Sequence, residues 1–293
     1  MAGFKRNKHN PSALFTMGNF VMLLSLVTVG VCGFVLWAGY GFFRAEFPNV
    51  SALKAQFPVV HYRGRKLPPT VTLQKSRPSS WAGLNEISTA AVGAIVVSED
   101  WAFYQHKGYD PAQIRDAIHE DLEKGKFKRG ASTITQQVVK NVFLEADKTL
   151  WRKAKELWLA IRLEEAVGKK KILETYLNVA EWGEGVYGIR AAANLYFKKS
   201  PAELSAKEGA FLAMLLPSPI RYGQSYRRKN LTSYASRTVA SILDKMTQAH
   251  YIDEDERSRE VASPLSFEAS AQAEPLPPAD DEGPEAGSSD TAL

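Results

Sequence analysis

The stretch Asn85–Gly108, NEISTAAVGAIVVSEDWAFYQHKG, joins an apolar run to a sudden cluster of charged and aromatic residues. The run Glu86–Val97 is apolar on nearly every side, and the asparagine before it can cap a helix, so we predict a central, buried helix here. Glu99 and Asp100 follow where that helix ends. A low-dielectric wall beside them would raise one carboxyl pKa towards the range of a general base, which makes Glu99 a candidate catalytic residue. The alternative is an ordinary solvated helix end, although acids at a helix C-terminus oppose the macrodipole.

The helical pattern continues from this stretch as far as about residue 252. Trp151–Val167 and Lys170–Val179 carry apolar residues at helical spacing, and Tyr176 is among the inward-facing residues of the second segment. Asp110-Pro111 is a cap followed by a first-turn proline, and Ser205–Glu208 is a capping box that opens the apolar segment Gly209–Leu216. Hardly any window alternates with the period of two that strands show. We therefore predict a mainly α domain over residues 85–252.

The two flanks of this domain have different compositions. Residues 44–84 are mixed and interrupted by five prolines, which predicts a linker with short extended pieces. Residues 253–293 are rich in Pro, Ser, Ala and acids, which predicts an acidic, disordered tail. The chain has a net charge of +5, and removing the seven acidic residues after Val261 leaves +12. A body this basic suits an anionic partner, whether nucleic acid, anionic lipid or a phosphorylated substrate.

The N-terminal region predicts a membrane anchor. Phe20–Tyr40 is apolar, and no charged residue lies between His9 and Arg44. About 20 residues make a helix of roughly 30 Å, the thickness of a bilayer's hydrocarbon core. We therefore expect a transmembrane helix over 20–43. A cleaved signal peptide is the alternative, but its apolar core would be shorter and a small-x-small cleavage site would follow.

Charges before the apolar run predict its orientation. Lys5, Arg6 and Lys8 precede it, so the positive-inside rule places residues 1–19 in the cytoplasm and the main body outside. The single cysteine, Cys32, excludes a disulfide framework and a cysteine-cluster zinc site.

A second polar segment, Lys126–Asn141, reads KFKRGASTITQQVVKN. Its small hydroxyls and amides supply many neutral hydrogen-bonding groups, which suit hydroxyl-rich sugars, while Lys140 adds a point charge suited to phosphate. The alternative is a capped helix with amides on its solvent face. A third segment, Arg152–Glu156 (RKAKE), has the spacing of an exposed salt-bridged helix face, and spacing alone favours that interpretation.

Together these segments resemble the glycosyltransferase domain of the peptidoglycan polymerases, glycosyltransferase family 51. The resemblance covers roughly residues 87–246 and rests on five motifs in order: EDWAFYQHKG, GASTITQQVVKN, RKAKELWLAIRLEE, KKKILETYLNVAEWGEGVYGIRAAANLYF and LSAKEGAFLAMLLPSP. It implies a lysozyme-like α fold and lipid II as substrate. The chain stops before a transpeptidase domain, so it is similar to the monofunctional peptidoglycan transglycosylases.

Matched positions imply roles for individual residues. Glu99 would be the general base and Glu156 the second acidic residue of the cleft. The candidate substrate-binding residues are Asp100, Phe103, His106, Ser132, Thr133, Gln136, Gln137, Lys140, Lys148, Arg152 and Lys155. Among them Lys140, Arg152 and Lys155 would contact the lipid-linked pyrophosphates, and the hydroxyls and amides would line the sugar sites. Lys148 stands where some relatives have arginine, and Lys124–Arg129 falls where the family has a mobile segment.

The resemblance also implies the setting of the reaction. It predicts an inverting polymerisation of lipid II into β1,4-linked strands with release of undecaprenyl pyrophosphate, at the cell inner membrane with the catalytic domain periplasmic. Lipid II, the growing strand, membrane lipid and other cell-wall synthesis proteins are the expected partners, and nucleic acid is not. A divalent cation, Mg²⁺ or Mn²⁺, is compatible with this chemistry, and no organic cofactor is expected. The alternatives are a lytic enzyme on the same fold, and a membrane-tethered binding protein without turnover.

Overall fold

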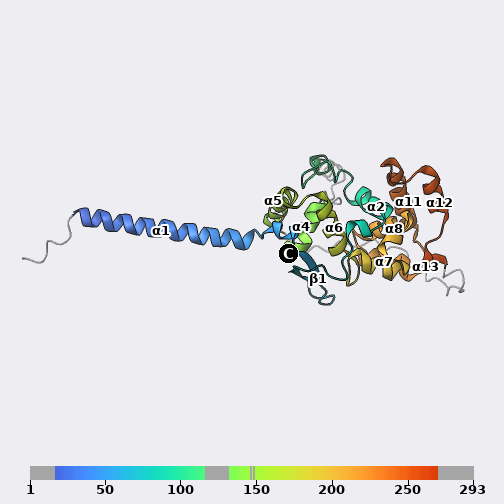
Figure 1. The fold of residues 1–293 in the computed structure, drawn as a ribbon, viewed down its shortest axis with the longest axis horizontal. Coiled ribbons are helices and arrows are strands. Elements are labelled where there is room, and N and C mark those ends of the chain that lie inside the picture. Colours follow the sequence, from blue (N-terminus) through green and yellow to red (C-terminus); the bar gives the residue numbers. More distant parts are fainter. Residues whose placement is uncertain (1–16, 116–131, 146, 148, 270–293) are drawn as a thin grey trace, which may run out of the picture. The chain divides into compact units, whose positions relative to one another are not determined.

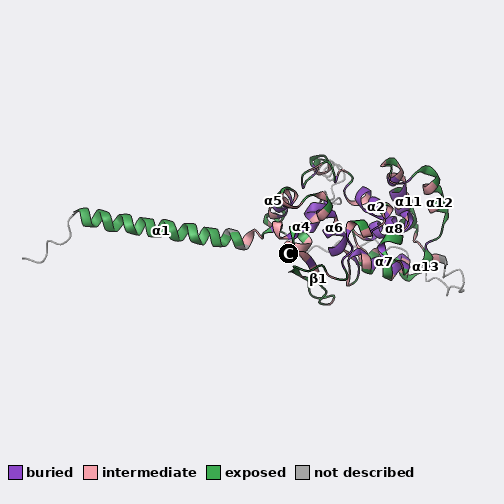
Figure 2. Ribbon diagram, in the orientation of Figure 1, coloured by how far each residue is buried: buried purple, intermediate pink, exposed green. Residues whose placement is uncertain are grey.

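The computed structural model describes residues 17–115, 132–145, 147 and 149–269 (Figure 1). The described chain is mostly helical, as predicted, with two short antiparallel hairpins. It forms two compact units, one ending at Asn49 and the other beginning at Val50. The first unit contains α1 (Met17–Glu46), whose segment Gly18–Phe42 is long and apolar enough to cross a membrane and is exposed throughout (Figure 2). The helix predicted over 20–43 is therefore present.

The second unit begins with short elements that lead into a bundle of helices. The short elements are η2 (Val50–Lys54), β1 (Phe57–His61), β2 (Thr70–Gln74) and η3 (Leu84–Glu86). The helices that follow are α2 (Thr89–Glu99), α4 (Ile134–Phe143), α5 (Leu150–Val167), α6 (Lys169–Val179), α7 (Ile189–Phe197), α8 (Ala206–Leu215), α9 (Pro219–Tyr222), α10 (Gln224–Arg227), α11 (Ser233–Gln248), α12 (Glu254–Ala262) and α13 (Ser266–Ala269). Between them lie β3 (Glu181–Gly183), β4 (Val186–Tyr187) and η4 (Pro201–Glu203).

Helix α2 lies at the centre of this bundle, as predicted, and packs against α8 and α11. Its residues from Ala91 to Val97 are buried, and so is all of α8 (Figure 2). The predicted start was wrong: Ser88, not Asn85, caps the helix by accepting the N–H of Ala91. Ser205 opens α8 through the predicted capping box. The predicted helix after Asp110 starts at residue 111, and residues 116–131 lie outside the described chain.

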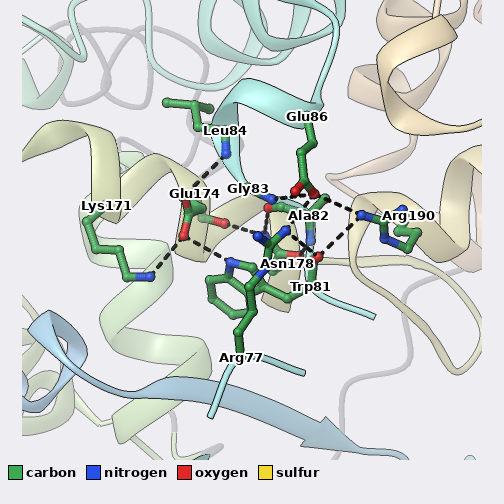
Figure 3. Close-up of polar contacts among 10 residues, drawn as sticks. All are labelled: Arg77, Trp81, Ala82, Gly83, Leu84, Glu86, Lys171, Glu174, Asn178 and Arg190. Carbon is green, nitrogen blue, oxygen red and sulfur yellow. Dashed lines mark hydrogen bonds and ion pairs between the residues drawn. The ribbon is translucent and has the colours of Figure 1, made fainter. Parts of the chain in front are cut away.

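Residues 50–84 belong to the folded unit, which corrects the predicted linker. The backbone at Ala82 and Leu84 bonds side chains of α6, and the apolar residues Val50, Leu53 and Trp81 are buried. The indole of Trp81 donates to Glu174 at 2.9 Å, and the Asn178 amide bonds both the N–H and the carbonyl of Ala82 at 2.8 Å (Figure 3). The ammonium of Lys171 donates to the same Glu174 carboxylate at 2.8 Å. The proline-rich composition suggested a linker. Composition alone does not reveal such long-range contacts, so the prediction missed them.

The C-terminal side also departs from the prediction, because α12 and α13 occupy part of the predicted disordered tail. Asp253 caps α12, and Phe267 is buried with its ring centroid 5.2 Å from that of Phe211. The Glu260 carboxylate accepts the Ser205 hydroxyl at 2.8 Å, which ties α12 to the start of α8. The tail prediction is therefore wrong as far as residue 269. Residues 270–293 lie outside the described chain.

The α2–α8 crossing generates a stability prediction at Gly209. A Cβ at this position would lie 2.6 Å from the Cα of Ala91, a backbone atom that cannot move aside. We expect Gly209→Ala to lower the free energy of unfolding by about 1–3 kcal/mol through overpacking, although alanine is the better helix former. Chemical denaturation measures this, with Ser236→Ala on the exposed side of α11 as the control. A Gly209→Ala chain as stable as the control variant would contradict the close packing.

Candidate active site

The carboxylate of Glu99 ends the buried helix α2 and meets side chains from α4 and α6. The Gln137 amide donates to Glu99 Oε2 at 2.8 Å, and the Tyr176 hydroxyl lies 3.4 Å from the same oxygen. Burial raises the pKa of the Glu99 carboxyl above its usual range, because the charged form loses its hydration. Hydrogen bonds from Gln137 and Tyr176, and the charge of Lys140, act in the opposite direction. A carboxylate in this state suits the acceptance of a proton near neutral pH.

The neighbouring carboxylate, Asp100, has a different environment. It is buried and accepts hydrogen bonds from His106 Nε2 at 2.9 Å and from the backbone N–H of Ile134 at 2.9 Å. Ile134 is the first residue of α4, so the carboxylate lies at the positive end of that helix. Asp100 therefore joins the end of α2 to the start of α4 and fixes where α4 begins relative to Glu99.

The loop between these helices is fixed by a second contact. The Thr133 hydroxyl donates to the carbonyl of Gly108 at 2.8 Å. Gly108 has a φ of 92°, and a Cβ there would lie 2.8 Å from the backbone carbonyl of Ala160 in α5. Only glycine combines this positive φ with the absence of a Cβ. The motif that ends at Gly108 therefore packs directly against α5.

A second ionic cluster lies on α5 around Glu156, which is only 2% exposed. Arg152 donates to its Oε2 at 2.6 Å, and Lys153 forms an ion pair with its Oε1. The Lys153 ammonium also donates to the Ser132 hydroxyl at 2.8 Å, which links α5 to the segment before α4. Two cations thus flank one buried carboxylate, and the cluster carries a net positive charge.

Lys140 on α4 connects this cluster with Glu99. Desolvation lowers the pKa of its ammonium group, and the attraction of Glu156 opposes that effect. Repulsion from Lys153 and Arg152 lowers this pKa further, while Glu99 raises it. Lys140 is therefore close enough to interact with both acidic residues. It also lines a groove of about 940 Å³, together with Asn141, Glu181, Tyr187 and residues of β1 and β2.

Several predicted substrate contacts have structural partners instead. Thr133 and Gln136 form the capping box of α4, in which each side chain bonds the other's backbone N–H. Both are buried, as are Asp100 and Phe103, so direct contact with substrate is not supported for these four residues. The ring of Phe103 packs against Tyr104 and under the ammonium of Lys169, at 4.3 Å. His106 holds Asp100. The alternative interpretation, a capped helix with amides on its solvent face, was correct for the cap at Thr133 but wrong for the amides, because Gln136 is buried and Gln137 turns towards Glu99.

Two residues at this site were not identified from the sequence. Lys153 pairs with Glu156, a contact not predicted from the sequence; the ammonium of Lys155, which was predicted to contact pyrophosphate, lies 6.0 Å from the ring centroid of Trp151. Helical phase could have found this, because a residue three before Glu156 shares its face and one directly before it does not. Tyr176 was predicted only as an inward-facing core residue, and its ring does lie in the core. Lys148 and the run Lys124–Arg129 lie outside the described residues.

The residues at this site do not fit a divalent cation held by the protein alone. Both Glu156 oxygens already hold a cationic side chain. Within the described part of the chain, no three His, Cys, Asp or Glu side chains come together as a metal-binding group. No step below is assigned to a metal.

The environment of Glu99 generates a stability prediction. Because its carboxyl pKa is higher in the folded chain than in the unfolded chain, ionised Glu99 destabilises the fold at neutral pH. We therefore expect Glu99→Gln to have an equal or higher melting temperature at pH 7.5. This difference should vanish below about pH 4, where both states are protonated. Melting curves across pH measure it, and a lower melting temperature for Glu99→Gln at pH 7.5 would show that the carboxylate is not desolvated.

Comparison with known proteins identifies the family of the chain. The model of the transglycosylase family matches residues 67–247, which include the α2, α4, α5 and α6 site. A biosynthetic peptidoglycan transglycosylase of Nitrosomonas eutropha is 35% identical over 224 residues, 76% of this chain and 87% of its own length. Proteins of the same name from Nitrosospira multiformis and Shewanella denitrificans are 40% and 44% identical, over 58% and 60% of this chain and 72% and 76% of their own lengths. The match covers well over half of the chain and includes both acidic residues of the site, so this protein belongs to the transglycosylase family.

Proposed function

We propose that this protein is a peptidoglycan glycosyltransferase that polymerises lipid II into β1,4-linked glycan strands and releases undecaprenyl pyrophosphate. The observation that carries this proposal is the desolvated Glu99 carboxylate, coupled through Lys140 to the cations around Glu156. Family membership and the names of the relatives support the glycan-polymerising activity. The substrate, the leaving group and the role of Glu99 are proposals.

Glu99 would act as the general base. The 4-hydroxyl of the acceptor sugar is a weak nucleophile at neutral pH. Transfer of its proton to Glu99 during the attack lowers the barrier and is typically worth about 10²–10⁴-fold in rate. The acceptor oxygen forms a bond to the anomeric carbon of the donor, and the bond from that carbon to the pyrophosphate oxygen breaks. A single displacement on an α-linked donor gives a β1,4 link, with inversion.

The cationic residues would stabilise the leaving group. Pyrophosphate carries several negative charges, so the developing charge is met by cations rather than by a proton donor. Lys140 and Lys153 present ammonium groups, and Arg152 offers a planar guanidinium that is partly occupied by Glu156. Glu156 would hold Arg152 and Lys153 in place. A lytic enzyme would not need this cluster, and for that reason we prefer synthesis to cleavage.

The N-terminal helix fits a substrate that is itself a lipid. Helix α1 indicates a single-pass membrane anchor. The basic residues before it support a cytoplasmic N-terminus and a catalytic domain on the outer side of the inner membrane. Confining enzyme and lipid-linked substrate to one surface raises their effective concentration.

Replacing the proposed base tests the mechanism. We expect Glu99→Gln to fold normally and to lose at least about 10²-fold in the rate of polymer formation. Incubation of the full chain with labelled lipid II, followed by gel separation of the products, measures this. Glu254→Gln, which removes an exposed partner of Arg257 on α12, outside the family motifs, is the matched control. Near-normal polymerisation by Glu99→Gln would reject Glu99 as the base. Release of fragments from finished peptidoglycan by the unmodified chain would favour a lytic enzyme.

A pair of lysines on α5 tests the leaving-group assignment. We expect Lys153→Ala to reduce polymerisation by about 10²-fold, because it removes a cation from the Glu156 cluster. Lys155→Ala should reduce it far less, since that side chain lies over Trp151. The two variants make the same chemical change two residues apart on one helix. Equal losses in the lipid II assay, or a larger loss for Lys155→Ala, would contradict the geometry.

A further inference from the structure

Tyr176 is a buried aromatic residue with one polar atom, and that atom does not point into the apolar core. The residue lies on α6 and is 1% exposed. Its hydroxyl lies 3.4 Å from Glu99 Oε2 and 3.3 Å from Gln137 Oε1. The Gln137 amide nitrogen lies 2.8 Å from the same Glu99 oxygen. Side chains from α2, α4 and α6 therefore form a closed triangle of hydrogen bonds.

The direction of these bonds depends on the tyrosine. A phenol has one proton, which Tyr176 shares between Gln137 Oε1 and Glu99 Oε2 in a bifurcated bond, and an amide has a donor end and an acceptor end. With its carbonyl oxygen accepting from Tyr176, Gln137 must turn its NH₂ group towards the carboxylate. A flipped amide would place its carbonyl oxygen against Glu99 Oε2, two acceptors without a proton between them. The carboxylate disfavours the flipped amide, and the bond from Tyr176 adds to the preference for the orientation that donates to Glu99.

The triangle also distinguishes the two carboxylate oxygens. Both contacts from Gln137 and Tyr176 are made to Oε2. A proton from a sugar hydroxyl would therefore be accepted at Oε1. Because one oxygen is held by these two contacts, the other keeps a fixed direction, and a base needs that fixed direction to meet a hydroxyl at contact distance.

We propose that Tyr176 is a positioning residue for the general base, acting through Gln137 and directly on Glu99 so that Oε1 faces the acceptor hydroxyl. This inference rests on the proposed function, because it assigns a role to the side chain that holds the proposed base. It adds a group from the fourth motif to a site otherwise built from the first three.

Removal of the hydroxyl should leave a signature in the pH profile. The charged groups that face Glu99 are Asp100, Lys140 and, when ionised, Tyr176 itself; Gln137 is neutral. The hydrogen bond from Tyr176 lowers the Glu99 pKa, against the larger effect of burial. Without the hydroxyl that pKa rises, so the acidic limb of the profile moves to higher pH. A residue that only fills space would not move it.

The experiment measures kcat/KM for lipid II against pH with the full chain. We expect Tyr176→Phe, which keeps the ring, to move the acidic midpoint up by about half a pH unit and to reduce the plateau rate about tenfold. The matched control is Tyr226→Phe, which removes a hydroxyl that donates to the Leu195 carbonyl at 3.0 Å, and its midpoint should not change. A midpoint for Tyr176→Phe that coincides with that of the unmodified chain overturns the proposal, whatever the plateau rate.

Two further measurements keep the inference testable if Tyr176→Phe folds poorly. Replacement of Tyr176 by 3-fluorotyrosine retains the ring and makes the hydroxyl a stronger donor, so the midpoint should move to lower pH; an unchanged or raised midpoint overturns the proposal. Gln137→Leu should raise the midpoint, and adding Tyr176→Phe to it should cause less further change than in the unmodified chain. Full additivity would show that Tyr176 does not act through Gln137.

Failure of this inference is distinguishable from failure of the proposed function. If Glu99→Gln polymerises lipid II at a normal rate, the acidic midpoint does not belong to Glu99 and the base assignment itself is wrong. If Glu99→Gln is inactive and the midpoint of Tyr176→Phe is unchanged, the base assignment stands and the positioning role is rejected.

Discussion

The structure depends on the junction where α2 ends and α4 begins, at which two adjacent carboxylates have opposite roles. Asp100 is fully used by the protein: it binds His106 and the first N–H group of α4. Glu99, one residue earlier, receives hydrogen bonds only from neutral donors among the described residues and is desolvated by the helices around it. Asp100 joins two helices, whereas Glu99 has a raised carboxyl pKa and is available for chemistry. The Asp100 contact, the bond from Thr133 to Gly108 and the packing of α4 against α5 and α6 together place Gln137 beside Glu99.

Helix α4 turns this junction into a site because three of its residues follow at intervals of three. Ile134 offers its N–H to Asp100, Gln137 donates to Glu99, and Lys140 interacts with both Glu99 and Glu156. Such spacing keeps side chains on one face of a helix. Helix α5 then supplies Glu156 with its two cations, and the close approach of Gly108 to the backbone of α5 brings the first motif against it. Base and cations therefore come from separate helices held at fixed separations.

Much of this arrangement could be predicted from the sequence, and the rest depends on contacts between distant residues. The capping boxes at Thr133 and Ser205 and the polar end of an apolar helix at Glu99 are local signals that need no tertiary information. The choice between Lys153 and Lys155 depends on which face of α5 is buried, and the hydroxyl of Tyr176 looks like any core tyrosine until Glu99 lies beside it. Residues 50–84 and 253–269 were misjudged because proline and acidic composition outweighed a few buried residues such as Trp81 and Phe267.

The central claim is that the Glu99 carboxylate is desolvated and therefore has a raised pKa. The most direct measurement is a ¹³C NMR titration of the full chain labelled at its glutamate carboxyls, with the Glu99 resonance identified by its loss in Glu99→Gln. We expect its midpoint to lie above the value of about 4.3 for an unperturbed glutamate. A midpoint at or below that value would contradict the claim, since the site would then hold an ordinary hydrated carboxylate.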